Sequence, residues 1–239
     1  MDRLDKIISN NTTYSRKDVK KIIQSGNVIV NNVVIKDPNK KFDKDNDEIY
    51  VYNKRINIQE HMYIMLNKPQ GYVCATEDKK DKTVIDLIPQ EYLVKEIFPV
   101  GRLDKDTTGL LILTDDGVMA HNLLSPIKHV SKTYIVKIDI PLTQEMCVGF
   151  KNGVVLNDGI CKEAKLEILE ENVGKVTLTE GRYHQIKRMF GCFGAKVIEL
   201  HRESMGNLSL PKDMKLGECR EISEEELILL KNSNRKLNV

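Results

Sequence analysis

Apolar residues at helical spacing mark two short helices near the N-terminus. Each places three of them at positions i, i+3 and i+4: Leu4, Ile7 and Ile8 within residues 2–9, then Val19, Ile22 and Ile23. Ser15 precedes the second group and has Asp18 three residues after it, which is a capping-box arrangement. Gly26 follows the last apolar residue and predicts the end of this helix.

Beyond these helices the pattern becomes that of strands. Residues 28–30 and 33–35 flank an Asn-Asn pair and predict a hairpin, and residues 49–51 predict a further strand. After residue 60, short alternating segments follow one another through turns, often with no helical segment between them. We therefore predict an α+β fold with a mostly antiparallel, mixed β-sheet and flanking helices.

A polar, charged stretch separates two regions of unequal length. We predict a small domain over residues 1–55, a linker over 56–61 and a large domain over 62–230. Residues 231–239 are polar and predict a frayed tail.

Composition narrows the class of protein. The chain has 239 residues, 41% hydrophobic and 30% charged, which is typical of a soluble globular protein. It has no run of about 18 apolar residues and no apolar segment at its N-terminus, so we expect no membrane span and no signal peptide. Five scattered cysteines without a Cys-x-x-Cys pair predict reduced thiols in the cytoplasm. Neither the cysteines nor the five histidines are spaced as metal ligands, so we expect no metal site.

Charge is unevenly distributed along the chain. Residues 1–41 contain nine Lys/Arg and four Asp/Glu, a balance of +5, although the whole chain has a net charge of only +2. A basic segment ahead of a nearly neutral body predicts a module that binds a polyanion; a solvated charged face is the alternative.

One segment carries a candidate catalytic carboxylate. The sequence Gly101-Arg102-Leu103-Asp104 is followed by an apolar stretch, Leu110–Leu113, and by Asp115-Asp116-Gly117. Taken alone, these residues predict a surface turn that leads into a buried strand. In order and spacing, however, the segment 99–117 resembles the catalytic motif of the RNA pseudouridine synthases. This resemblance implies that Asp104 is the catalytic acid.

Two other segments match further elements of that family. Lys68 lies in an Asn-Lys-Pro-x-Gly sequence, where it would be an RNA-contacting or site-supporting cation, unless it is simply exposed in a turn. Lys132 and Tyr134 match the Lys-x-Tyr element. Tyr134 would stack on the uracil and its hydroxyl would assist a proton transfer; the alternative is an ordinary cross-strand aromatic residue.

Near the end of the large domain, an amphipathic helix is predicted after Glu180. Its apolar face comprises Ile186, Met189, Phe190 and Phe193, and Gly194 would end it. Lys187 lies about 100° from Ile186, at the edge of this face, whereas Arg188 lies about 200° away. The family places a Lys or Arg beside the catalytic Asp at the position of Lys187, where it would keep Asp104 ionised. We expect Arg182 and Arg188 to contact RNA or solvent. Without the Asp104 segment, an ordinary amphipathic helix would be preferred.

The N-terminal region, residues 2–52, resembles the S4 RNA-binding domain. The similarity rests on Arg3-Leu4-Asp5-Lys6, Ser15-Arg16-Lys17 and the Gly26-x-Val28-x-Val30-Asn31 sequence. In that family the paired helices lie on structured RNA. The resemblance therefore implies phosphate contacts by five cations: Arg3, Arg16, Lys17, Lys20 and Lys21.

The implied reaction breaks the N1–C1′ bond of a uridine, turns the uracil and joins C5 to C1′. It involves no redox change and no net consumption of water, so we expect no cofactor. A carboxylate can act in it as nucleophile or base. The uridine must be flipped out of its stack, and Arg102 would hold the phosphate of the flipped strand or fill the vacated space.

Within the synthases, the chain is most similar to the small-subunit branch of the RsuA family. This similarity rests on the 72–78, 180–190 and 204–206 segments. It implies that a monomer modifies uridine 516 of 16S ribosomal RNA. Two alternatives stay open: a large-subunit (23S) rRNA pseudouridine synthase of the same family, and a non-catalytic rRNA-binding assembly factor. The presence of Asp104, Tyr134 and Lys187 argues against the second.

Overall fold

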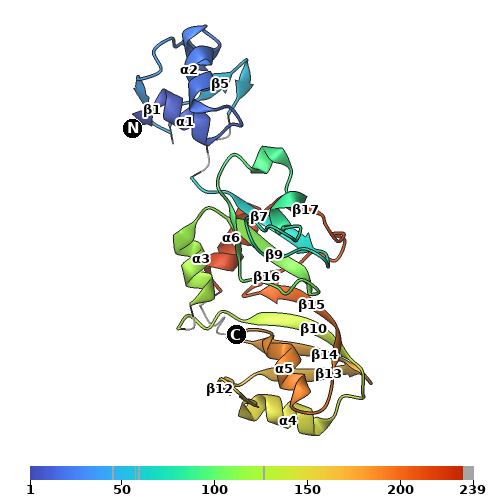
Figure 1. Ribbon diagram of the computed structural model, residues 1–239. Coiled ribbons are helices and arrows are strands. Elements are labelled where there is room, and N and C mark those ends of the chain that lie inside the picture. Colours follow the sequence, from blue (N-terminus) through green and yellow to red (C-terminus); the bar gives the residue numbers. More distant parts are fainter. Residues whose placement is uncertain (45, 57, 59, 126, 234–239) are drawn as a thin grey trace. The chain divides into compact units, whose positions relative to one another are not determined.

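The computed structural model describes residues 1–44, 46–56, 58, 60–125 and 127–233. Contacts within the chain divide it into two compact units (Figure 1). Unit 1 comprises Met1–Met62 with Ile88–Ile97, and unit 2 comprises Tyr63–Leu87 with the chain from Phe98 onward. The predicted tail falls largely on residues 234–239, which lie outside the described residues.

Unit 1 contains two helices against a small antiparallel sheet of order β3-β2-β5-β6. Its elements are β1 Asp2–Arg3, α1 Leu4–Asn10, α2 Arg16–Gln24, β2 Val28–Val30, β3 Val33–Val34, β4 Lys41–Phe42, β5 Ile49–Val51, β6 Lys54–Arg55 and a 3₁₀ turn Gln90–Tyr92. The predicted helix over 2–9 begins at Leu4 instead, because Asp2 and Arg3 pair with β4. Ile56, placed in the predicted linker, packs into the hydrophobic core of this unit.

Local sequence explains two boundaries in unit 1. The Ser15 hydroxyl caps α2 by accepting a hydrogen bond from the amide of Asp18. Asn31 and Asn32 both have left-handed backbones, with φ of 48° and 64°, and so form the tight turn between β2 and β3. The Ser15 cap fixes the start of α2, which carries four of the five predicted phosphate-binding cations, Arg16, Lys17, Lys20 and Lys21.

Unit 2 is built on one large mixed sheet of order β13-β14-β10-β15-β9-β7-β17. Its elements are β7 Tyr63–Lys68, a 3₁₀ turn Val84–Leu87, β8 Phe98–Val100, β9 Thr108–Thr114, α3 Gly117–Leu124, β10 Lys132–Ile138, α4 Gln144–Asn152, β11 Val155–Leu156, β12 Gly159–Ile160, β13 Lys165–Glu170, β14 Val173–Leu178, α5 Gln185–Gly191, β15 Val197–Met205, β16 Leu208–Ser209, β17 Cys219–Glu221 and α6 Glu224–Lys231. Of the described pairings in this sheet, β15 with β9 is parallel and the others are antiparallel. The predicted α+β class is confirmed.

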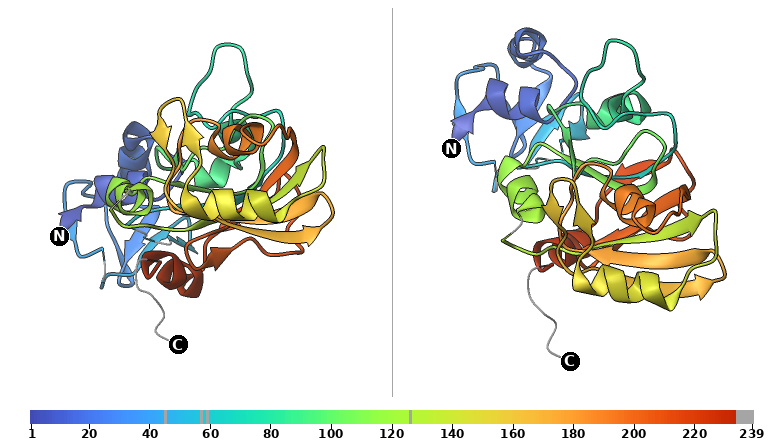
Figure 2. Two further views of the ribbon diagram at one scale, coloured as in Figure 1. Left: turned by 90° about the horizontal axis from the view of Figure 1, so that it is seen from below. Right: turned by 60° about the horizontal axis from the view of Figure 1, so that its bottom comes forward.

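Helices flank both halves of this sheet. Helix α4 packs along β13, and α3 and α6 lie near β8 and β16 (Figures 1 and 2). Helix α5 ends at Gly191, earlier than the predicted end at Gly194. Phe193 nevertheless packs inward, with its ring stacked 6.2 Å from that of Phe150. None of the described helices is both long and apolar enough to cross a membrane.

Candidate active site

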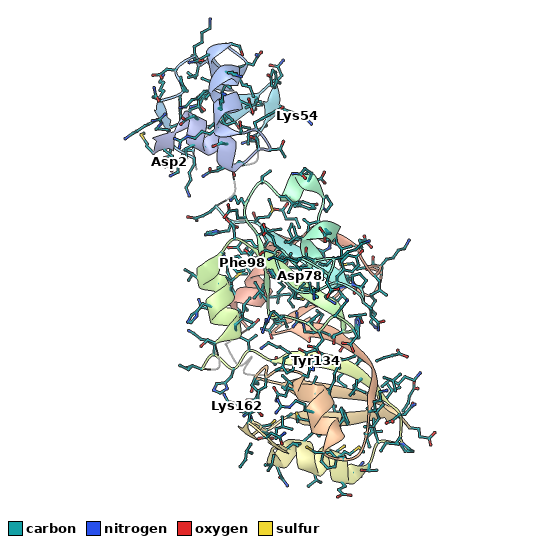
Figure 3. All side chains as sticks on the ribbon, viewed as in Figure 1. Asp2, Lys54, Asp78, Phe98, Tyr134 and Lys162 are labelled. Atoms are coloured by element: carbon teal, nitrogen blue, oxygen red, sulfur yellow. The ribbon has the colours of Figure 1, made fainter. Side chains whose placement is uncertain are left out.

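A pocket of about 770 Å³ opens on the sheet of unit 2, a volume that suits a single nucleotide. Its lining comes chiefly from the segment after β7, the loop between β8 and β9, strands β10 and β15, and the segment that leads into α5. Tyr134 contributes from β10, in the middle of the unit (Figure 3). The pocket therefore brings together Asp104, Tyr134 and Lys187, which are far apart in sequence.

The backbone of the loop that carries Asp104 is hydrogen-bonded by the buried side chain of Lys68. The Lys68 ammonium donates hydrogen bonds to the backbone carbonyls of Asp104 (3.0 Å) and Thr107 (2.9 Å), and also contacts those of Pro69 and Lys105. The Lys68 side chain is fully buried, and burial lowers its pKa. The prediction of an RNA contact by Lys68 is therefore wrong, as is the alternative of an exposed turn. The site-supporting role is the one that fits.

Glycine allows this loop to turn sharply at its start. Gly101 has a φ of +70°, and a side-chain carbon there would come within 2.9 Å of Met205 Cε. Leu103, two residues later, is buried and anchors the loop, and its amide donates to the Cys74 sulfur. Asp104 is consequently left on the pocket side of the loop, with a quarter of its side chain exposed.

Lys187 bridges two carboxylates at the mouth of the pocket. Its ammonium lies 2.9 Å from Asp104 Oδ2 and 2.6 Å from Asp106 Oδ1. Helix α5 presents it from the edge of the buried face that contains Ile186 and Met189, as the helical spacing indicated. Burial opposes the charge of Lys187, but the hydrogen bonds to the two carboxylates outweigh it and raise the pKa of this lysine. Burial likewise opposes the charge of Asp106, and the Lys187 hydrogen bond outweighs it and lowers that pKa.

A histidine that sequence reasoning missed also faces Asp104. His184 Nε2 lies 3.5 Å from Asp104 Oδ1, and the His184 ring stacks on that of Tyr183 with centroids 3.8 Å apart. His184 has a left-handed backbone, with φ of 49°, just before α5 begins. This conformation turns the His184 ring toward the Asp104 carboxylate, and no local pattern in the sequence predicts this conformation.

The two predicted RNA-binding arginines of the α5 region are both engaged in ion pairs. Arg188 contacts both Asp158 oxygens, at 2.5 and 3.1 Å. Arg182 contacts Asp158 and Glu180, and donates to the Gly159 carbonyl at 3.0 Å. These arginines fasten the β11–β12 hairpin to the start of α5 while remaining about a quarter exposed, and their contact with RNA stays a prediction. Arg102, by contrast, is exposed and lines the pocket.

In unit 1 a buried carboxylate organises the predicted phosphate-binding cations. Asp5 is fully buried and contacts Arg3 at 2.9 Å, Arg16 at 3.2 Å and Lys20 at 4.0 Å. Burial raises the pKa of Asp5, but the hydrogen bonds from the two arginines outweigh it, so the pKa falls below the usual value. Lys17 and Lys21 are exposed on α2, where no ion pair with a described residue is seen.

The site offers acid–base and electrostatic chemistry from protein groups. Among the described residues, no cluster of histidine, cysteine and carboxylate side chains is suited to hold a metal ion. An anionic carboxylate beside a lysine, an aromatic ring on the pocket wall and exposed cations nearby suit a nucleotide substrate.

Comparisons with known proteins agree with this arrangement. Residues 62–191 match the model of the RNA pseudouridylate synthase family, and residues 2–49 match that of the S4 domain. The chain is 44% identical to an uncharacterized RNA pseudouridine synthase, YtzG, of Bacillus subtilis, over 95% of this chain and 98% of the relative. It is 38% identical to ribosomal small subunit pseudouridine synthase A of Escherichia coli, over 94% of this chain and 98% of that protein. A solved pseudouridylate synthase covers 96% of the chain and is itself fully covered, with a TM-score of 0.68 and 37% identity.

Proposed function

The chain belongs to the RNA pseudouridine synthase family, among the S4-domain enzymes that act on ribosomal RNA, and from this premise we propose that it forms the pseudouridine at position 516 of 16S rRNA, with Asp104 as the catalytic carboxylate. The 16S target is supported by relatives of 38–39% identity that carry the name ribosomal small subunit pseudouridine synthase A.

The observation that carries the catalytic proposal is the Asp104–Lys187 pair at the pocket. The 2.9 Å contact holds a carboxylate beside a space large enough for a nucleotide. Lys68 fixes the backbone of Asp104 itself, so the carboxylate is positioned before substrate arrives. Such preorganisation is what acid–base or nucleophilic chemistry requires.

The remaining residues act on the flipped nucleotide. Tyr134, buried on β10, offers the ring against which the extruded uracil stacks. Arg102, exposed at the pocket, contacts the RNA backbone or fills the place of the departed base. The cations around Asp5 in unit 1, with Lys17 and Lys21, supply affinity for phosphates that is largely independent of RNA sequence.

The direct test maps pseudouridine across total rRNA from cells with and without this protein. We expect one 16S position to lose its modification without the protein and to regain it with the wild type, but not with Asp104→Asn. Loss of a 23S position instead would identify a large-subunit enzyme of the same family. Unchanged modification in both rRNAs would favour the non-catalytic assembly factor.

A further inference from the structure

Two cations lie deep in the pocket of unit 2, apart from the Asp104–Lys187 pair. Lys132 is on β10, and Arg202 is on β15 directly opposite Tyr134 in the strand register. Lys132 and Tyr134 are two residues apart on one strand, so all three side chains share one face of the sheet. Lys132 is 7% exposed and Arg202 is 1% exposed, yet both line the pocket.

These two cations lack the partners that buried charges normally have. Arg202 Nε donates to the Leu110 carbonyl at 2.7 Å, but its buried Nη2 has no hydrogen-bond partner among the described residues. Among the described residues, Lys132 Nζ donates a hydrogen bond to the Val130 carbonyl alone, at 3.4 Å. In the part of the chain that the structure describes, neither cation lies in an ion pair.

An unpaired buried charge is costly, and here two of the same sign lie near each other. Burial, aided by the charge of Arg202, lowers the pKa of Lys132 to about 8. Lys132 is therefore still mostly protonated at neutral pH. The floor of the pocket thus carries positive charge that the protein itself leaves uncompensated.

We infer that Lys132 and Arg202 bind the negative charge that the uracil acquires when its bond to the ribose breaks. The depth of the two cations in the pocket favours a uracil anion over a phosphate as their ligand. A flipped nucleotide enters the pocket base first, and its phosphates stay with the RNA chain at the pocket mouth. The Tyr134 ring, on which the uracil is proposed to stack, lies on the same face as both cations. This inference rests on the proposed pseudouridine synthase activity but not on the 16S target.

The chemistry requires such a site at one step. When the N1–C1′ bond breaks, its electron pair stays on the uracil, and C1′ is compensated either by bonding to the Asp104 carboxylate or by losing a ribose proton. After the ring turns, C5 bonds to C1′ while the Asp104–C1′ bond breaks or, on the other route, while the ribose carbon regains its proton; the C5 proton then leaves and N1 gains a proton. The neutral bound uridine and the product carry no such charge. Cations at the floor therefore favour the charged state over the ground state, which accelerates bond cleavage.

The test compares Lys132→Met with Lys137→Met, a control on the same strand whose side chain points to the opposite face and is 45% exposed. Single-turnover tritium release from C5-labelled uridine is measured at saturating rRNA, 16S and 23S separately, with RNA affinity measured in parallel. We expect Lys132→Met to slow release about 100- to 1,000-fold, the cost of removing one preorganised charge donor. Its RNA affinity should stay within about threefold, and Lys137→Met should match the wild type.

Two further arms separate a catalytic role from a structural one. Lys132→Arg keeps the charge and should restore the rate to within about tenfold of the wild type, a loss of at most about 1.4 kcal/mol. With 5-fluorouridine at the target, the fluorine already stabilises the uracil anion. The deficit of Lys132→Met in consuming the target nucleoside should therefore shrink, whereas a misfolded pocket would be equally defective on both substrates.

Each outcome decides the inference. A normal rate in Lys132→Met overturns it, and so does weaker RNA binding with an unchanged rate at saturation, which would identify a phosphate contact instead. An equal deficit on both substrates, or no recovery in Lys132→Arg, also overturns it. If the wild type releases no tritium from either rRNA, the proposed activity fails as well; with an active wild type, only the inference is at stake.

Discussion

In unit 1 three cations converge on one buried carboxylate, whereas the two buried cations on the pocket floor of unit 2 have no carboxylate partner among the residues that the structure describes. Arg3, Arg16 and Lys20 surround Asp5, so each of these cations has a carboxylate partner before any ligand arrives, although the cluster keeps a net positive charge. Lys132 and Arg202 are left without an ion pair among the described residues. The Asp5 cluster stabilises unit 1 and holds cations at its surface. The unpaired charges of Lys132 and Arg202 lower the stability of unit 2, and we infer that the negative charge of the reacting uracil neutralises them.

The Asp104–Lys187 pair is the compensated part of the pocket, and breaking it should have the largest effect. We expect Lys187→Met to lower the single-turnover rate about 100- to 1,000-fold, because a preorganised charge next to the reacting carboxylate is lost. The neighbouring variant Arg188→Met removes a pair with Asp158, partly exposed, and should cost at most about fivefold.

The single-turnover rates of both variants are compared at saturating rRNA, and circular dichroism establishes that each variant folds. Equal losses, or a larger loss in Arg188→Met, would show that Lys187 is not the residue that supports catalysis by Asp104.

The next effect concerns the support of the catalytic loop. Lys68→Met removes the hydrogen bonds to the carbonyls of Asp104 and Thr107 while keeping the buried stem. We expect the rate to fall about 100-fold, the usual cost of misplacing a catalytic group by about 1 Å. RNA affinity, measured by filter binding, should be unchanged because Lys68 is buried. A large fall in affinity with a normal rate would return Lys68 to the RNA-contacting role.

Local patterns in the sequence predicted the parts of this fold that neighbouring residues determine. The Ser15 cap, the Asn31-Asn32 turn and the edge position of Lys187 on α5 all depend on residues within a few positions of each other. The pairing of Lys187 with Asp104 came from the family resemblance, since the two are 83 positions apart in the chain.

What the sequence could not reveal depends on register and on backbone conformation. Arg202 faces Tyr134 only because β15 pairs with β10 in one particular alignment. His184 reaches Asp104 through a left-handed backbone, which few residues other than glycine adopt. Lys68 matched a turn motif, but tertiary packing buries it. Such placements follow from contacts between distant segments.

The uncompensated cluster should show itself in stability as well as in rate. Burial lowers the pKa of Lys132 to about 8 in the folded protein, below the 10.5 of a free lysine. Below pH 8, Lys132 is protonated in both the folded and the unfolded protein, so burying its charge lowers the free energy of unfolding by the full amount, about 3 kcal/mol. Between pH 8 and 10.5 the unfolded state binds more protons, so wild-type stability rises with pH.

Lys132→Met has no charge to bury at this position. We therefore expect it to be more stable than the wild type by up to about 3 kcal/mol at pH 7, and this gain in stability should vanish above pH 10.5. Urea unfolding at several pH values measures this. A destabilised variant at pH 7 would show that Lys132 is compensated after all.

The smallest effect tests the cations of unit 1 that lie outside the Asp5 cluster. Replacing Lys17 and Lys21 with alanine should reduce the slope of log affinity against log salt by about 2, since each phosphate contact contributes about 1. The rate at saturating RNA should not change. Lys151→Ala, an exposed lysine of α4, is the control and should leave the slope unaltered. An unchanged slope in the double variant would remove α2 from the RNA-binding surface.

The claim on which all of this depends is that Asp104 is the catalytic carboxylate, and Asp104→Asn tests it most directly because it removes the charge and keeps the shape. The measurement is tritium release from C5-labelled uridine in small-subunit rRNA, under single turnover and with RNA binding measured alongside. We expect near-normal binding and no detectable release. Release within about tenfold of the wild type, which is a loss of only about 1.4 kcal/mol of transition-state stabilisation, would contradict the account.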